Sequence, residues 1–105
     1  NEVMAAQMTV VEDALAADVQ AAGADPWDNT LAYTYDDGVF HGYLYAVPDG
    51  MGIEFDKNSY LWDAETPIYS RYVMCGHGTR VEERLLAENW QELVSTEDLV
   101  VYKRS

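Results

Sequence analysis

The first 56 residues of this chain contain no lysine and no arginine, yet they carry eleven carboxylates. Residues 1–70 hold thirteen acids against the single base Lys57, a balance of −12. Residues 71–105 hold six acids and five bases, a balance of −1, and the two balances sum to the net charge of −13. Because an unpaired carboxylate is costly to bury, any fold of this sequence must display most of these acids. Such a surface repels itself, and we favour a positively charged partner as the reason for it.

The composition indicates one folded domain rather than an acidic tail. Apolar residues make up 49% of the chain and aromatic residues 12%, which is too much for a disordered segment. We treat residues 1–105 as a single domain, in which residues 1–8 need not be ordered. Cys75 is the only cysteine, so no internal disulfide can form. No apolar run approaches the roughly 20 residues of a membrane helix, and we expect a cytoplasmic protein.

A capping box predicts the first helix. In the sequence from Thr9 to Glu12, the hydroxyl and the carboxylate can satisfy free amides at a helix start. The alanine-rich run continues to Ala22, and Gly23 can end it. Asp18 falls on the apolar face of this helix, so either it pairs with an arginine from the last third of the chain, which we favour, or the helix ends earlier.

A second capping box, from Thr79 to Glu82, predicts a helix that extends to about Leu93. Within it, Arg84 and Glu88 have the spacing of an ion pair on a helix surface. The chain therefore has two predicted helices, one before and one after its central part.

The central part alternates between apolar and polar residues, which is typical of strands. Leu31–Asp36 and Val39–Val47 flank Asp37-Gly38, a dipeptide favoured in tight hairpin turns, and Met51–Asp56 alternates again. Further strands are predicted over 60–64, 68–75 and 99–102. The expected fold is α+β: a small two-layer domain with an antiparallel meander of about four to five strands packed with two helices.

Motifs for catalysis or metal binding are weak in this sequence. Cys75 and His77 with the distant His41 could in principle bind zinc, but we interpret them as a buried thiol and a loop histidine. No recognised nucleophile, phosphate-loop or dinucleotide motif occurs. We therefore predict no enzyme, no metal and no cofactor, and keep Cys75 with either histidine as the alternative nucleophilic site.

The predicted binding residues are carboxylates supported by aromatic side chains. Tyr43 and Tyr45 share one face of the predicted hairpin, and this face is either exposed for binding or covered by a helix. The set comprises Glu12, Asp13, Asp25, Trp27, Asp28, Asp36, Asp37, Tyr43, Tyr45, Asp49, Glu54 and Asp56.

In size, charge and aromatic content the chain resembles the small acidic inhibitors that phages and mobile elements direct against nucleic-acid-handling defence systems. These are anti-CRISPR and anti-restriction proteins that imitate DNA. The resemblance implies a partner with a basic nucleic-acid-binding groove, such as a CRISPR effector, a restriction enzyme or a nuclease toxin. Direct binding of nucleic acid is disfavoured by charge repulsion. An immunity protein or antitoxin against a basic nuclease, and a halophilic acidic domain of unrelated function, are the alternatives.

Overall fold

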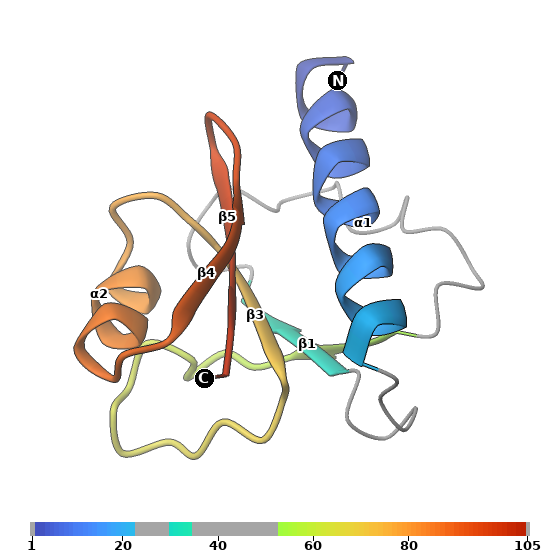
Figure 1. Cartoon of the computed structure of the whole chain (residues 1–105). Helices are drawn as coiled ribbons and strands as arrows, with labels where there is room; N and C mark the ends of the chain where they lie inside the picture. Colours follow the sequence, from blue (N-terminus) through green and yellow to red (C-terminus); the bar gives the residue numbers. More distant parts are fainter. Residues whose placement is uncertain (1, 23–29, 35–52, 105) are drawn as a thin grey trace.

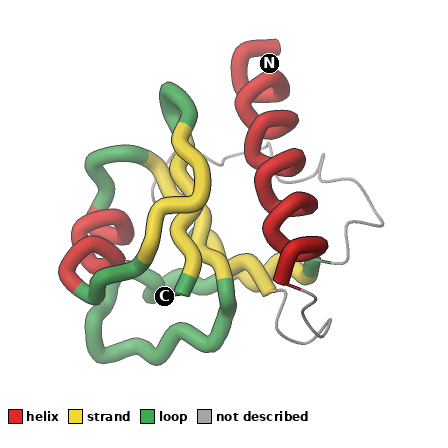
Figure 2. The backbone as a smooth tube through the Cα atoms, in the orientation of Figure 1, coloured by secondary structure: helices red, strands yellow, loops and turns green. Residues whose placement is uncertain are grey.

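A computed structural model describes residues 2–22, 30–34 and 53–104 of the chain. In these residues two helices and a five-stranded sheet form a small α+β domain, which confirms the predicted class (Figures 1 and 2). The elements are α1 (Glu2–Ala22), β1 (Thr30–Tyr33), β2 (Glu54–Lys57), β3 (Tyr72–Gly76), α2 (Arg80–Ala87), β4 (Gln91–Ser95) and β5 (Leu99–Lys103).

The sheet is mixed, with the strand order β2-β1-β3-β5-β4. β1 is parallel to both of its neighbours, β2 and β3, whereas β5 is antiparallel to β3 and β4. The predicted antiparallel meander is therefore wrong, because its first and third strands pair directly here. The strand predicted between them, 39–47, and its predicted turn lie outside the described residues. Alternation fixes which face a side chain occupies, but it does not specify the neighbouring strand.

The helices cover opposite faces of the sheet, so the domain has three layers instead of the predicted two (Figure 1). Along β3, Tyr72 and Met74 join the core on the α1 side, and Val73 and Cys75 join the core on the α2 side. β5 alternates in the same way and is apolar at almost every position. Central strands that are apolar on both faces need a cover on each, and one helix supplies each cover.

The first helix begins at Glu2, seven residues before its predicted start. Thr9 is inside the helix, where its hydroxyl donates a hydrogen bond to the Ala5 carbonyl at 3.1 Å instead of capping a helix end. The apolar spacing continues backwards through the predicted cap and outweighs it. Residues buried by this helix are Met4, Gln7, Met8, Val11 and Leu15.

Gln7 connects this helix to the turn between β4 and β5. Its amide nitrogen donates to the Asp98 carboxylate at 2.6 Å, and its amide oxygen accepts from the Asp98 amide at 2.8 Å. The Thr96 hydroxyl also donates to the same oxygen. A buried polar side chain must find such partners, and here all of them come from the turn between β4 and β5.

The second helix begins at the predicted cap. The Glu82 amide donates to the Thr79 hydroxyl at 3.3 Å, while the Glu82 carboxylate accepts from the Gly78 amide at 2.9 Å. The helix ends at Ala87, well before the predicted end, because Asn89 has a φ of 62° and turns the chain into β4. The final strand, β5, matches its prediction closely.

Replacing Thr79 with alanine is expected to lower the free energy of unfolding by about 1 kcal/mol, since an amide of the first turn loses its acceptor. Urea denaturation measures this loss. Thr9→Ala is the matched control, because the Thr9 hydroxyl caps no helix end and should contribute little. Equal losses at the two threonines would contradict the assigned cap.

Candidate functional site

Four of the twelve predicted binding residues lie within the described part of the chain. Glu12 and Asp13 are on α1, and Glu54 and Asp56 are on β2. The other eight, which lie outside the described residues, are Asp25, Trp27, Asp28, Asp36, Asp37, Tyr43, Tyr45 and Asp49.

The β2 acids are exposed, as predicted, and their strand lies at the edge of the sheet. Glu54 and Asp56 alternate with Phe55, which packs against the core on the α1 side. The Phe55 ring lies edge-on to Tyr33 with ring centres 6.4 Å apart. Side chains alternate across a strand, so both carboxylates project from the face that α2 covers elsewhere. Neither forms an ion pair with another described residue.

The α1 acids lie on the opposite side of the sheet from the β2 acids. Asp13 is exposed and Glu12 is half-buried. Burial raises the pKa of Glu12, and the neighbouring Asp13 charge adds to the effect. The described residues therefore bring the predicted acids together only as two separate pairs.

Asp18 is paired as predicted, although its closest partners are a lysine and a tyrosine. Its carboxylate accepts hydrogen bonds from Tyr72 at 2.7 Å and Lys103 at 3.0 Å, and Arg71 lies 3.9 Å away. Burial raises the pKa of Asp18, but the two hydrogen bonds and the nearby charges outweigh it, and the net shift is downward. Burial and the bond to Asp18 raise the pKa of Tyr72 to about 12. This cluster fixes the end of α1 to the sheet.

Arg84 holds the segment between β2 and β3 in place. Its side chain is only 7% exposed, and it donates to the carbonyls of Leu61 at 3.0 Å and Thr66 at 2.6 Å. The predicted pair with Glu88 is present at 2.7 Å, but its arginine is buried and not on the surface.

The strand predicted over 60–64 is wrong. The chain makes turns there, in which the side chains of Asn58 and Asp63 accept from the amides of Tyr60 and Glu65, each at 3.0 Å. Asparagine and aspartate favour such turns, and they outweigh the strand preference of the aromatic residues between them.

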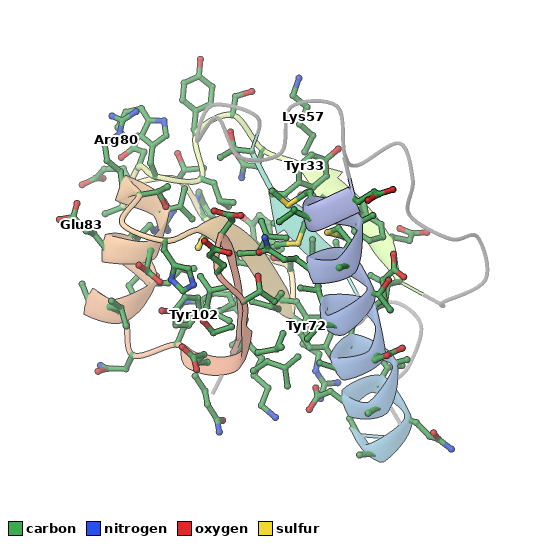
Figure 3. The ribbon with its side chains drawn as sticks, turned by 90° about the horizontal axis from the view of Figure 1, so that it is seen from above. Tyr33, Lys57, Tyr72, Arg80, Glu83 and Tyr102 are labelled. Atoms are coloured by element: carbon green, nitrogen blue, oxygen red, sulfur yellow. The ribbon has the colours of Figure 1, made fainter. Side chains whose placement is uncertain are left out.

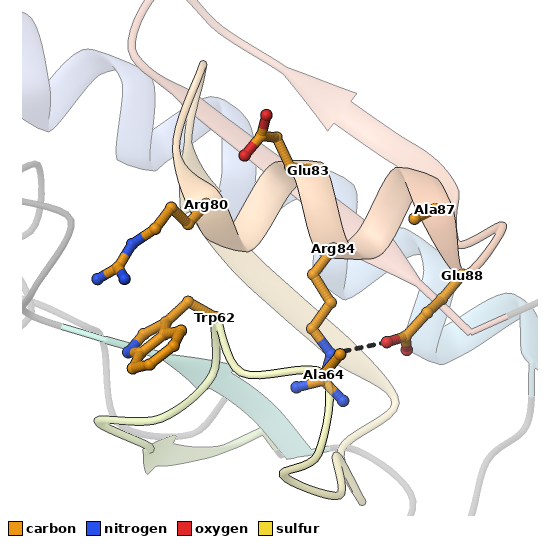
Figure 4. Close-up of a pocket in the computed structure, with 7 residues that line it drawn as sticks. All are labelled: Trp62, Ala64, Arg80, Glu83, Arg84, Ala87 and Glu88. Atoms are coloured by element: carbon orange, nitrogen blue, oxygen red, sulfur yellow. Dashed lines mark hydrogen bonds and ion pairs between the residues drawn. The ribbon is translucent and has the colours of Figure 1, made fainter.

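A shallow groove lies between α2 and the segment that joins β2 to β3, with a volume of about 420 Å³ (Figure 4). The Arg80 guanidinium stacks over the Trp62 ring, 4.2 Å from its centre. The groove is lined by Trp62, Ala64, Arg80, Glu83, Arg84, Ala87 and Glu88. Its mixture of both charges with an aromatic ring suits contact with another surface.

His77, Ser95 and Glu82 have the residue types of a hydrolytic triad. The His77 Nε2 atom lies 3.0 Å from the Ser95 hydroxyl, and Nδ1 lies 3.4 Å from Glu82. However, Nε2 is closer to the Thr96 carbonyl, at 2.8 Å. A carbonyl only accepts, so this contact requires a hydrogen on Nε2, and in that tautomer Nε2 has no lone pair for the serine proton. The cluster therefore joins the start of α2 to the β4–β5 turn.

Glu82 is the centre of that cluster and also bonds to β5. Burial raises its pKa, but hydrogen bonds from Gly78 and Tyr102 and the proximity of His77 lower it by more. Tyr102, which is labelled in Figure 3, donates a hydrogen bond to the Glu82 carboxylate at 2.9 Å. Burial together with this hydrogen bond raises the pKa of Tyr102.

Cys75 is fully buried among the apolar residues on the α2 side, which removes its thiol from contact with a substrate. His41 lies outside the described residues. Among the residues that the structure describes, no group of three or more potential ligands could hold a metal ion.

No protein-family model, curated protein or solved structure matches this chain. Within the described ranges, neither helix combines the length and apolar character that crossing a membrane requires.

Proposed function

We propose that this protein is an acidic inhibitor that binds the basic nucleic-acid-binding groove of a defence complex or nuclease, as a mimic of DNA or RNA. The observation that carries the proposal is that its bases are engaged internally. Arg71 and Lys103 contact Asp18, and Arg84 holds two carbonyls and Glu88. Arg80 and Arg104 stack on tryptophan rings, so all five bases of residues 71–105 contact other groups of the chain.

Three of the predicted binding acids are used differently from these bases. Asp13, Glu54 and Asp56 are exposed and make no ion pair with a described residue. The bases therefore stabilise the fold, and the net charge of −13 remains for the surroundings. A field from many carboxylates steers a cationic partner and speeds association.

Such an inhibitor needs no catalytic group. Its carboxylates would accept charge-assisted hydrogen bonds from the arginines and lysines that otherwise bind phosphate. Because the same side chains of the partner would contact either ligand, protein and nucleic acid should exclude each other.

The partner can be identified by capture from a lysate of the cells that encode the protein, at low and high salt, with and without duplex DNA. We expect to recover a nucleic-acid-binding protein that added duplex displaces. If that protein is a nuclease toxin, the inhibitor acts as an immunity protein or antitoxin. Recovery only of partners indifferent to DNA would contradict the proposal.

Reversing the β2 acids is expected to slow binding to the captured partner. In the double variant Glu54→Lys, Asp56→Lys, we expect the association rate constant at low salt to fall by about tenfold, because four units of charge are removed from one edge of the sheet. The matched control is Glu92→Lys, Glu97→Lys, which makes the same charge change on exposed residues of β4 and the following turn. Stopped-flow measurements in which both variants associate as fast as the wild type would argue against charge steering.

A further inference from the structure

Two arginines stack on tryptophan rings in this molecule, and their guanidinium groups are used differently. Arg104 lies over the buried Trp90 ring, 4.5 Å from its centre, and also donates to two carbonyls of the segment that precedes β3. Arg80 lies over Trp62, but its guanidinium forms no hydrogen bond or ion pair with any residue that the structure describes. The five N–H groups of the exposed Arg80 side chain therefore remain available to a ligand.

Arg80 is held in a fixed position at the groove between α2 and the segment that joins β2 to β3 (Figure 4). The Trp62 ring beneath it packs against the core on the α2 side. Arg84 donates to the carbonyls of Leu61 and Thr66, which lie before and after Trp62 in the sequence. A guanidinium stacked on such a ring is pre-organised, because it loses less freedom when it forms hydrogen bonds with a ligand.

The other charged residues of the groove restrict the charge of its ligand. Glu88 is already paired with the buried Arg84, and the Glu83 carboxylate points away from Trp62 (Figure 4). Arg80 is thus the charged group that remains available beside Trp62, which favours an anion over a cation. The two glutamates and the net charge of −13 repel a dianion more strongly than a monoanion. A single carboxylate therefore suits the groove better than a phosphate.

The remaining groups that line the groove are apolar. Ala64 and Ala87 contribute methyl groups, and the Trp62 ring is half-buried. The volume of about 420 Å³ is in the lower part of the range for small-molecule sites, which is about 300–1,000 Å³. We propose that this groove binds a small monocarboxylate with an apolar body. Its carboxylate forms a bidentate pair with Arg80, and its apolar body contacts Trp62 and the two alanines.

Proton–nitrogen NMR of the whole chain tests the proposal, with 3-phenylpropionate as the probe. Increasing concentrations of the probe should shift the signals of the Trp62 indole N–H and the Arg80 side-chain N–H until they saturate. In Arg80→Met, the dissociation constant should rise by about tenfold or more, because the bidentate pair is lost. Arg80 is exposed, so this variant should keep the wild-type fold. The matched control, Arg71→Met, removes the same charge beside Asp18 and should bind the probe like the wild type.

Three further probes keep the phenyl group and change the head group: 3-phenylpropionamide, 3-phenylpropylamine and phenyl phosphate. Each should bind more weakly than 3-phenylpropionate. Equal or tighter binding of the amide would show that the groove recognises only the apolar body, and equal or tighter binding of the amine or the phosphate would show that the charge assignment is wrong. Any of these results would overturn the proposal.

The proposal would also be overturned if Arg80→Met bound 3-phenylpropionate as tightly as the wild type. The same holds if the Trp62 signal of the wild type did not respond to millimolar 3-phenylpropionate. None of these results would affect the proposed inhibition, whose readout is displacement by DNA.

Discussion

Replacing Arg84 with methionine is expected to lower the free energy of unfolding by about 3 kcal/mol, the largest effect of any substitution considered. Methionine keeps most of the length and apolar volume of the side chain but removes all three donors. The buried carbonyl of Leu61 then loses its hydrogen-bond donor. The partly buried Thr66 carbonyl and Glu88 carboxylate also lose the donor that Arg84 supplied. An unsatisfied buried acceptor costs about 1–3 kcal/mol.

Arg80→Met is the matched control for this prediction, because it changes the same residue type in the same helix. Arg80 is exposed and stacks on Trp62, a contact worth about 0.5–1 kcal/mol at an exposed site. Urea denaturation monitored by tryptophan fluorescence gives both values. Similar losses in the two variants would show that the bonds from Arg84 to the loop carbonyls contribute little.

Asp18→Asn is expected to lower the free energy of unfolding at pH 7 by about 2 kcal/mol, the usual scale for hydrogen bonds to a charged group. The pKa of Asp18 is lower in the folded protein than in the unfolded chain, where it is about 3.9. The stabilisation of the fold by the Asp18 carboxylate is therefore fully present above about pH 4. It is lost as the pH falls through the pKa that Asp18 has in the folded protein. The difference between variant and wild type should shrink over the same acidic range.

Asp13→Asn serves as the control for Asp18, because Asp13 is exposed on the same helix and forms no ion pair with a described residue. Its effect should stay within about 0.5 kcal/mol at neutral pH. A constant difference between Asp18→Asn and wild type from pH 7 down to pH 2 would contradict the assigned charge interaction.

Local chemistry predicted several features correctly. Thr79 caps a helix because a hydroxyl at that position satisfies a free amide whatever the fold. Asp18 has a partner because an unpaired carboxylate on an apolar helix face would be too costly. Glu54 and Asp56 face outward because alternation places Phe55 inward.

Features that depend on contacts between distant parts of the chain were not predicted. Nothing in the alternation of residues 31–36 indicates that β1 would lie between two parallel neighbours. The spacing of Arg84 and Glu88 predicts an ion pair on the helix surface, whereas Arg84, like Arg104, donates to loop carbonyls. A clue was available for Arg84, since it is placed between Val81 and Leu85 on the buried side of α2. The eight predicted binding residues outside the described ranges remain predictions.

The hydrogen bonds of Gln7 have a consequence for how the chain folds during synthesis. They connect residues that are separated by 89 and 91 positions in the sequence. The Asp18–Lys103 pair connects residues separated by 85 positions. At ribosomal speeds of about 5–20 residues per second, α1 waits on the order of ten seconds for these partners. Throughout that interval Met4, Met8, Val11 and Leu15 have no strand β5 to pack against. The packing of α1 therefore waits for the last strand pair, and until then repulsion between like charges opposes association of nascent chains.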